Sequence, residues 1–159
     1  MGDGNIGKGH IGTWCRAGFE RYLAWRYGAI DSTAPLGRRG EQAAARALRR
    51  RGWKILAHSE SDRLGELDLI ALDGRTLVFV EVKTLASRRP GHPAERVDAD
   101  KQRRITQAAL RYLKRHRLLE QRARFDVVAI WWPETAPRPV RLELYENAFA
   151  AQGEGQWFC

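Results

Sequence analysis

The stretch GELDLIALDGRTLVFVEVKT, residues 65–84, decides the fold of this chain. Two apolar runs flank Asp73-Gly74, a dipeptide that is typical of tight β-hairpin turns. We therefore expect antiparallel strands over residues 66–72 and 76–83. The second run is apolar on both of its faces for most of its length, which indicates a central strand that helices cover on both sides.

Charged side chains gather on one face of this hairpin. With the turn centred on that dipeptide, the alternation of side chains places four of them on the same side: Glu66, Asp68, Glu81 and Lys83. Asp68 and Glu81 are then diagonal neighbours, with roughly 7–8 Å between their backbone positions. Three carboxylates on one face destabilise a sheet unless a cation relieves their repulsion.

A divalent cation explains this arrangement. Mg²⁺ (or Mn²⁺) prefers a few carboxylate ligands and keeps several waters, which leaves sites for phosphate oxygens. Lys83, two residues after Glu81, can orient or help to deprotonate the attacking water. The alternative is a solvated hairpin face on which Lys83 only pairs with Asp68 or Glu81. The apolar flanks of both strands place these charges inside a sheet and therefore favour the metal site.

Two helices are expected outside the hairpin. Strong helix formers over residues 41–51, followed by Gly52, predict the first helix. Glu41 lies on the apolar stripe of this helix, which is an unusual place for a surface carboxylate. The second helix is expected to begin after Asp98 or Asp100, either of which can cap it, and to run to about Arg117.

Three further strands are expected over residues 53–57, 125–132 and 140–145, which gives the order α-β-β-β-α-β-β. The pattern predicts an α/β protein with a mixed central sheet flanked by helices.

The length of 159 residues suits a single main domain. We assign residues 38–150 to this domain. Residues 1–37 are expected to form an N-terminal appendage that is partly disordered and holds a short amphipathic helix, and residues 151–159 to form a C-terminal tail.

The charge of the chain points to a polyanionic partner. Twenty-eight lysines and arginines against 19 acids give a net charge of +9, and such a surplus favours binding to phosphates. The basic side of the second helix offers candidate nucleic-acid contacts: Lys101, Arg103, Arg104, Arg111 and Lys114. A merely solvated basic face is the alternative, because arginine-rich chains can be basic without a functional reason.

No apolar run approaches the roughly 18 residues of a membrane span, so no membrane partner is expected. The glycine-rich start lacks the apolar stretch of a signal peptide, which predicts a cytoplasmic location. The two cysteines, Cys15 and Cys159, have no second ligand at zinc spacing, and no cofactor other than the divalent cation is expected.

Five motifs occur in a recognisable order: GE (40–41), GELDLIA (65–71), LVFVEVKT (77–84), KQRRITQAALRYL (101–113) and RFDVVAI (124–130). They resemble the motifs of the YraN-like family of uncharacterised bacterial proteins, over about residues 37–150. That resemblance implies the restriction-endonuclease-like PD-(D/E)xK superfamily, with an α-β-β-β-α-β core. The YraN-like family is also similar to the archaeal Holliday-junction resolvases.

The resemblance also implies roles for individual residues. Asp68 and Glu81 match the metal-binding acids, and Lys83 matches the catalytic lysine. Glu41 matches the helix acid that completes the metal site. Gln102 stands where related nucleases often have a glutamine that contributes to the active site.

We therefore expect a Mg²⁺- or Mn²⁺-dependent nuclease that hydrolyses phosphodiester bonds. DNA is the favoured substrate, with branched or structured DNA as a candidate. Two alternatives stay open: a nucleic-acid-binding module that uses the same fold without turnover, and an RNA- or ribosome-associated protein. The sequence also leaves the oligomeric state open, a homodimer included.

Overall fold

The computed structural model describes residues 21–62, 65–86 and 97–153. The expected disordered start of the appendage, within residues 1–20, and most of the expected tail lie outside these residues. Five strands of the described chain form one sheet in the order β1-β2-β3-β4-β5. The strands are β1 (Lys54–Asp62), β2 (Gly65–Asp73), β3 (Thr76–Leu85), β4 (Ala123–Trp131) and β5 (Arg141–Phe149).

The sheet is mixed, as expected. β3 and β4 are parallel, whereas the other neighbouring strands are antiparallel. A parallel pair needs a long crossover, and α3 (Ala99–Arg115) provides it. The helix α2 (Leu36–Arg50) precedes the sheet, and residues 21–27 are helical as well. The expected order α-β-β-β-α-β-β is therefore confirmed.

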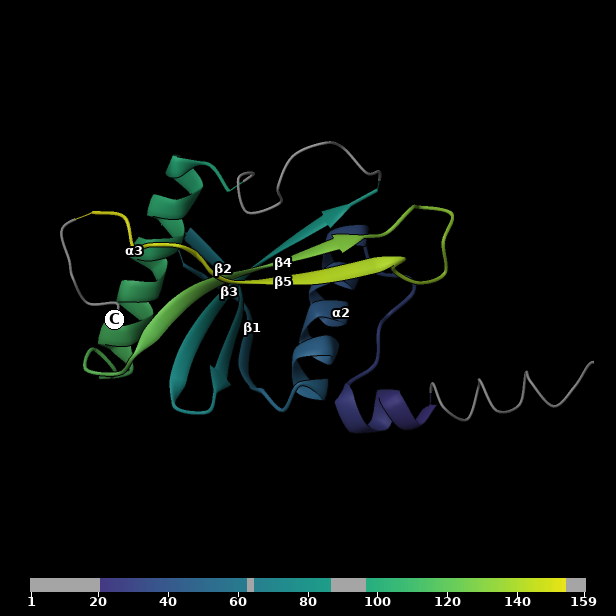
Figure 1. Ribbon diagram of the computed structural model, residues 1–159, viewed down its shortest axis with the longest axis horizontal. Helices are drawn as coiled ribbons and strands as arrows, with labels where there is room; N and C mark the ends of the chain where they lie inside the picture. Colours follow the sequence, from purple (N-terminus) through teal and green to yellow (C-terminus); the bar gives the residue numbers. More distant parts are fainter. Residues whose placement is uncertain (1–20, 63–64, 87–96, 154–159) are drawn as a thin grey trace, which may run out of the picture.

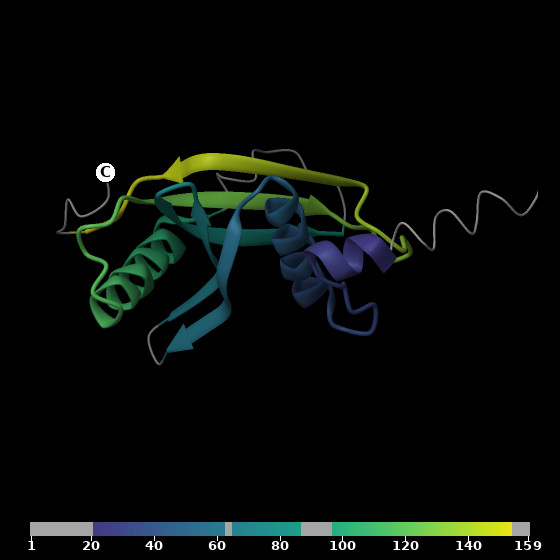
Figure 2. The same ribbon diagram turned by 90° about the horizontal axis from the view of Figure 1, so that it is seen from below.

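The two long helices pack on opposite faces of the sheet. Val78 and Val80 of β3 belong to the apolar cluster beneath α2, and Leu77 and Phe79 belong to the cluster beneath α3. This division follows from the alternation of side chains along a strand. In both Figure 1 and Figure 2, the β1–β2 hairpin passes between α3 and α2.

The first helix begins earlier than expected. α2 starts at Leu36, directly after Pro35, whose φ of −53° suits the entry to a helix. The expected boundary between residues 37 and 38 therefore falls inside the first turn of α2. The preceding segment packs on this helix, since Leu23 is buried and Arg49 Nη1 donates to the Tyr27 carbonyl at 3.0 Å.

The turn of the β2–β3 hairpin differs from the expected one. It consists of Gly74 and Arg75, so that Asp73 stays in β2 and pairs with Thr76. Gly74 has a φ of +57° and is the first central residue, the place where a type II′ turn requires glycine. Asp73 is also held in the strand by Arg124, whose Nη2 donates to its carboxylate at 2.9 Å.

This turn shifts the pairing of β2 with β3 by two residues from the expected register. Leu69 and Val80 form the last pair of this ladder, and the same register carried one residue further puts Asp68 opposite Glu81 rather than diagonal to it. An even shift keeps Asp68 on the same face as Glu81, because side chains alternate with a period of two. A turn centred on Asp73-Gly74 would also place Glu66 opposite Glu81, whereas Glu66 instead pairs with Ser61 of β1.

A second ionic group of the sheet has a structural role. Asp126 of β4 is fully buried and accepts a hydrogen bond from Arg124 Nε at 3.0 Å. The same carboxylate accepts from the Asn147 backbone at 2.9 Å, where the β4–β5 register shifts. Burial raises the pKa of Asp126, and the bond from Arg124 opposes this rise. The pair fixes a β-bulge, and it accounts for two charged residues of the RFDVVAI motif.

No helix in the described part of the chain combines the length and the apolar character that crossing a membrane requires.

Candidate active site

Two carboxylates lie side by side where β2 and β3 separate. Glu81 is only 4% exposed, and Asp68 Oδ2 accepts a hydrogen bond from the Val82 backbone at 2.7 Å. Burial, and then the negative charge of Glu81, raise the pKa of Asp68 to about 7. Two acids so placed repel each other at neutral pH, and a bound cation would remove that repulsion.

Each oxygen of the Glu81 carboxylate faces a lysine. Lys83 Nζ lies 2.9 Å from Oε1, and Lys101 Nζ lies 3.4 Å from Oε2. Lys83 comes from the same strand, whereas Lys101 comes from the first turn of α3. Lys101, expected only as a nucleic-acid contact, is therefore part of the acid cluster.

The N-terminus of α3 is held by two side chains, which fixes Lys101 in place. Asp98 caps the helix and accepts from the Lys101 backbone at 2.8 Å. Gln102 Nε2 donates to the carbonyl of buried Val97 at 2.8 Å. Gln102, expected in the active site, thus uses its amide to anchor the chain that enters α3. We interpret it as a positioning residue for Lys101.

The expected third acid is held by another group. Glu41 Oε2 accepts a hydrogen bond from Ser59 Oγ of β1 at 2.8 Å. Its charge is still close enough to Asp68 to add to the rise of that residue's pKa. Within the described ranges, no three acids, histidines or cysteines converge on a point where they could hold one metal ion. The structure therefore brings Asp68 and Glu81 together, and it leaves Glu41 beside them without completing a three-acid group.

α2 approaches the site through a glycine. A Cβ atom on Gly40 would lie 1.8 Å from Thr84 Oγ1 of β3, so the helix can pack this closely only without a side chain there. Thr84 follows Lys83 directly, and Glu41 follows Gly40. The GE pair of the sequence thus combines a close approach of the helix with an acid placed near Asp68.

Gly40→Ala should therefore destabilise the protein by about 1–3 kcal/mol, the usual cost of overpacking a close contact. Gly37→Ala is the matched control, because it lies in the same helix and a Cβ atom there would meet no other side chain within 4 Å. The control should be neutral or stabilising by up to about 1 kcal/mol. Urea unfolding of both variants measures the difference. Equal effects of the two substitutions would show that the helix does not need its close contact with Thr84.

The acid pair suits a hard divalent cation. Both side chains offer carboxylate oxygens, and Mg²⁺ commonly binds to one or two carboxylates while it keeps several waters. Burial first, and then the negative charge of Glu81, raise the pKa of Asp68, and a bound ion would favour the ionised form of this carboxyl. Asp68 and Glu81 are therefore the residues of this chain that would hold Mg²⁺ or Mn²⁺.

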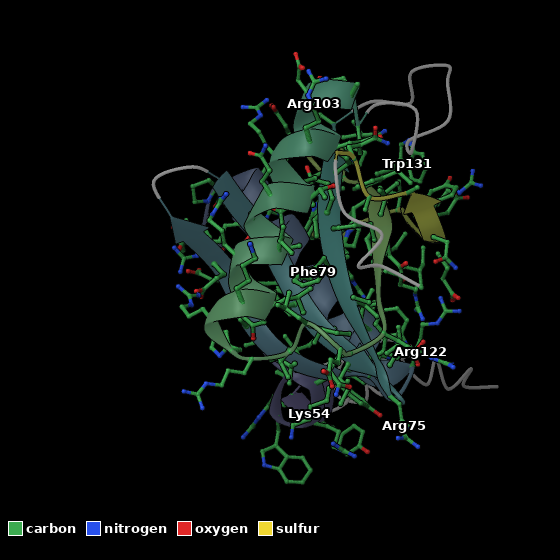
Figure 3. All side chains as sticks on the ribbon, turned by 90° about the vertical axis from the view of Figure 1, so that its left-hand side faces the viewer. Lys54, Arg75, Phe79, Arg103, Arg122 and Trp131 are labelled. Carbon is green, nitrogen blue, oxygen red and sulfur yellow. The ribbon has the colours of Figure 1, made fainter. Side chains whose placement is uncertain are left out.

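The expected nucleic-acid contacts divide between two sides of α3. Lys101, Arg104 and Arg111 lie on one stripe, because their spacing returns to the same side of a helix with 3.6 residues per turn. Arg103 and Lys114 lie on another side, and Arg103 pairs with Asp100. In Figure 3, Arg103 stands at one end of α3, and Phe79 lies behind the helix. The five residues thus do not form one surface.

The fold and the cluster define a mixed α/β protein with a buried acid pair and two lysines at one site. The family model "Uncharacterised protein family UPF0102" matches residues 40–130, and this chain belongs to that family. The expected YraN-like resemblance is thereby confirmed.

Relatives match most of the chain. A UPF0102 protein of Rhodopirellula baltica is 59% identical over 151 residues, which are 91% of this chain and 90% of the relative. A UPF0102 protein of Symbiobacterium thermophilum is 48% identical and covers 73% of this chain and 97% of its own length. One of Syntrophus aciditrophicus is 46% identical, with 71% and 87% covered.

Proposed function

We propose that this protein is a metal-dependent nuclease that hydrolyses phosphodiester bonds, with DNA as the favoured substrate. One observation carries the proposal: Asp68 and Glu81 lie together inside a sheet, with Lys83 Nζ at 2.9 Å from Glu81. Buried like charges destabilise a fold, and a site that binds a cation and phosphate is a physical reason for keeping them. We also propose that the α/β fold of this chain is the restriction-endonuclease-like core expected from the sequence.

The residues of the site would divide the work as follows. Asp68 and Glu81 would hold Mg²⁺ or Mn²⁺, and such an ion, when bound, lowers the pKa of water and offsets charge on phosphate oxygens. Lys83 Nζ has three hydrogen-bond donors and would orient the attacking water towards the phosphorus. Lys101 would add a second positive charge beside the phosphate.

A non-catalytic binding module is the second candidate, and specific contacts favour it. Both oxygens of Glu81 are already neutralised by lysines, and Ser59 holds the carboxylate of Glu41. In this alternative, the cluster is an ionic network that fixes α3 against the sheet. The lysines and arginines of α3 would then bind phosphates without hydrolysis.

One experiment separates the two. The purified protein is incubated with linear, single-stranded and four-way-junction DNA in Mg²⁺, Mn²⁺ or EDTA. We expect cleavage only with metal, and none by Glu81→Gln. Glu134→Gln, an exposed acid of the β4–β5 loop, serves as the control with the same charge change and should cut normally. DNA binding without cleavage of any substrate in either metal would support the binding module instead.

A further inference from the structure

A groove runs between α3 and the β1–β2 hairpin, next to the acid cluster. It consists of two neighbouring cavities of about 280 Å³ and about 320 Å³, and Ser61 and Gly65 border both of them. Figure 2 shows the hairpin projecting beside α3. The residues that line the groove come from both of these elements. We call it the α3 groove.

Cations line the wall of this groove that α3 provides. They form one stripe of the helix: Lys101, Arg104, Arg111 and Arg115. At a rise of about 1.5 Å per residue, the stripe extends for about 20 Å. Lys101 also contacts Glu81 at 3.4 Å, so one end of the stripe reaches the acid cluster. A chain of phosphates that followed the stripe would therefore arrive at the proposed catalytic residues.

Apolar groups lie beneath these cations. Leu67, Ala108 and Tyr112 line the first cavity. The Tyr112 ring is held in place, because its centroid lies 6.0 Å from Phe79 in an edge-on contact and 4.3 Å from His116. Arg115 lies over the Tyr112 ring, 5.9 Å from its centroid, so the ring and a cation of the stripe together form a contact surface for a base and its phosphate.

Gly65 borders both cavities and brings no side chain into the groove. A Cβ atom on Gly65 would lie 3.4 Å from Ala108 Cβ and 3.4 Å from the Arg104 carbonyl oxygen. A larger side chain at this position would fill the space between the two cavities. Gly65 has no positive φ, so its backbone does not require glycine. The structure therefore explains the glycine at position 65 by the open space of the groove and not by the backbone conformation of a turn.

We propose that the α3 groove binds an unpaired strand of nucleic acid and leads it to the acid cluster. The proposal rests on the proposed nuclease function and names its substrate class: DNA or RNA with unpaired nucleotides beside the scissile bond. Each cavity is near the lower limit of small-molecule pockets, about 300 Å³, a space that suits a single nucleotide. A base inside a duplex is stacked on both faces and cannot reach Leu67 and Tyr112 until it leaves the stack.

Two acids on the opposite wall provide a test that does not depend on loss of function. Glu60 pairs with Arg115, which offsets its charge. Glu66 is exposed and lies beside Lys101 and Arg104, where it repels a phosphate. Removing the charge of Glu66 should therefore strengthen binding, an effect that a damaged fold cannot produce.

The experiment measures the affinity of the full chain for labelled single-stranded DNA, single-stranded RNA of the same sequence, and duplex DNA, in EDTA so that no strand is cut. Glu66→Gln should tighten single-strand binding about threefold more than Glu134→Gln, which removes an equal charge from a loop far from α3 (Figure 1). Gly65→Leu should weaken it about tenfold or more, and Gly37→Leu, in open space on α2, should not. Duplex affinity should change little in all four variants.

The proposal is overturned if Glu66→Gln acts no more strongly than Glu134→Gln, or if Gly65→Leu weakens single-strand and duplex binding equally. The same measurements test the groove proposal and the nuclease proposal independently of each other. Single-strand binding that responds as expected, together with no cleavage in any metal, keeps the groove and rejects the nuclease. Cleavage without the expected changes in single-strand binding keeps the nuclease and rejects the groove. The DNA and RNA probes show which strand the groove prefers.

Discussion

Lys83→Ala should lower metal-dependent cleavage about 10²–10⁴-fold, while the affinity for DNA stays within about threefold of the wild type. The reason is the position of Lys83 Nζ at 2.9 Å from Glu81, next to the place where water and phosphate would meet. A group that acts at the transition state lowers kcat when it is lost, whereas one cation among many contributes little to phosphate binding. Cleavage rates and DNA affinity are measured on the same preparations.

Lys54→Ala is the matched control for this prediction. Lys54 is an exposed lysine at the start of β1, at the opposite end of the molecule from Arg103 (Figure 3). Its loss should leave cleavage unchanged. A purely structural Lys83 gives another result: the melting temperature falls, and activity declines only with the folded fraction. That outcome would remove Lys83 from the proposed chemistry.

Local patterns in the sequence were sufficient for most of the fold. Apolar runs bounded by turn residues predicted the central strands, and the second helix was predicted within about two residues at each end. The start of α2 was not predicted correctly, because Gly37 and Gly40 are poor helix formers and weaken the helical pattern of its first turns. Tertiary packing explains the exception, since Gly40 contacts Thr84 and must lack a side chain.

The turn of the central hairpin was predicted wrongly, but the face on which Asp68 and Glu81 lie was predicted correctly. Both Asp73-Gly74 and Gly74-Arg75 are two-residue turns, and the sequence alone favours the first. The observed turn keeps Asp73 in β2, where Arg124 binds it. Arg124 lies far away in the sequence, so no local pattern could reveal this contact. The predicted common face of the site residues was still correct, because the two registers differ by an even number of residues.

The candidate site was predictable where it is local in sequence. Glu81 and Lys83 are two residues apart on one strand, and their contact follows from the alternation of side chains. Lys101 and Ser59 were not placed at the site, because they reach it only through the packing of α3 and β1. A cation on a helix can lie over the core or in solvent, and spacing within that helix does not say which side meets the sheet.

Asp68→Asn should stabilise the folded protein at pH 8 and abolish cleavage. The pKa of Asp68 rises to about 7 in the folded state from its ordinary 3.8, through burial and then through Glu81. A carboxyl with a raised pKa favours the folded state below about pH 3.8, and this contribution is lost as the pH rises through about 7. The wild type therefore carries an ionised, poorly solvated Asp68 at pH 8, whereas asparagine stays neutral. Its amide oxygen can still accept from the Val82 backbone.

The gain of Asp68→Asn should be about 2–4 kcal/mol at pH 8, because each unit of pKa corresponds to about 1.4 kcal/mol. It should shrink steadily towards pH 4, which urea unfolding at several pH values measures. Asp31→Asn is the contrasting control, since hydrogen bonds from Thr33 lower the pKa of Asp31 and its substitution should bring no gain. Mg²⁺ or Mn²⁺ should raise the melting temperature of the wild type but not of Asp68→Asn, because ligand binding to the folded state stabilises it. A gain that does not vary with pH would mean that Asp68 is not destabilised by its charge, and the main physical reason for placing a cation between Asp68 and Glu81 would then be lost.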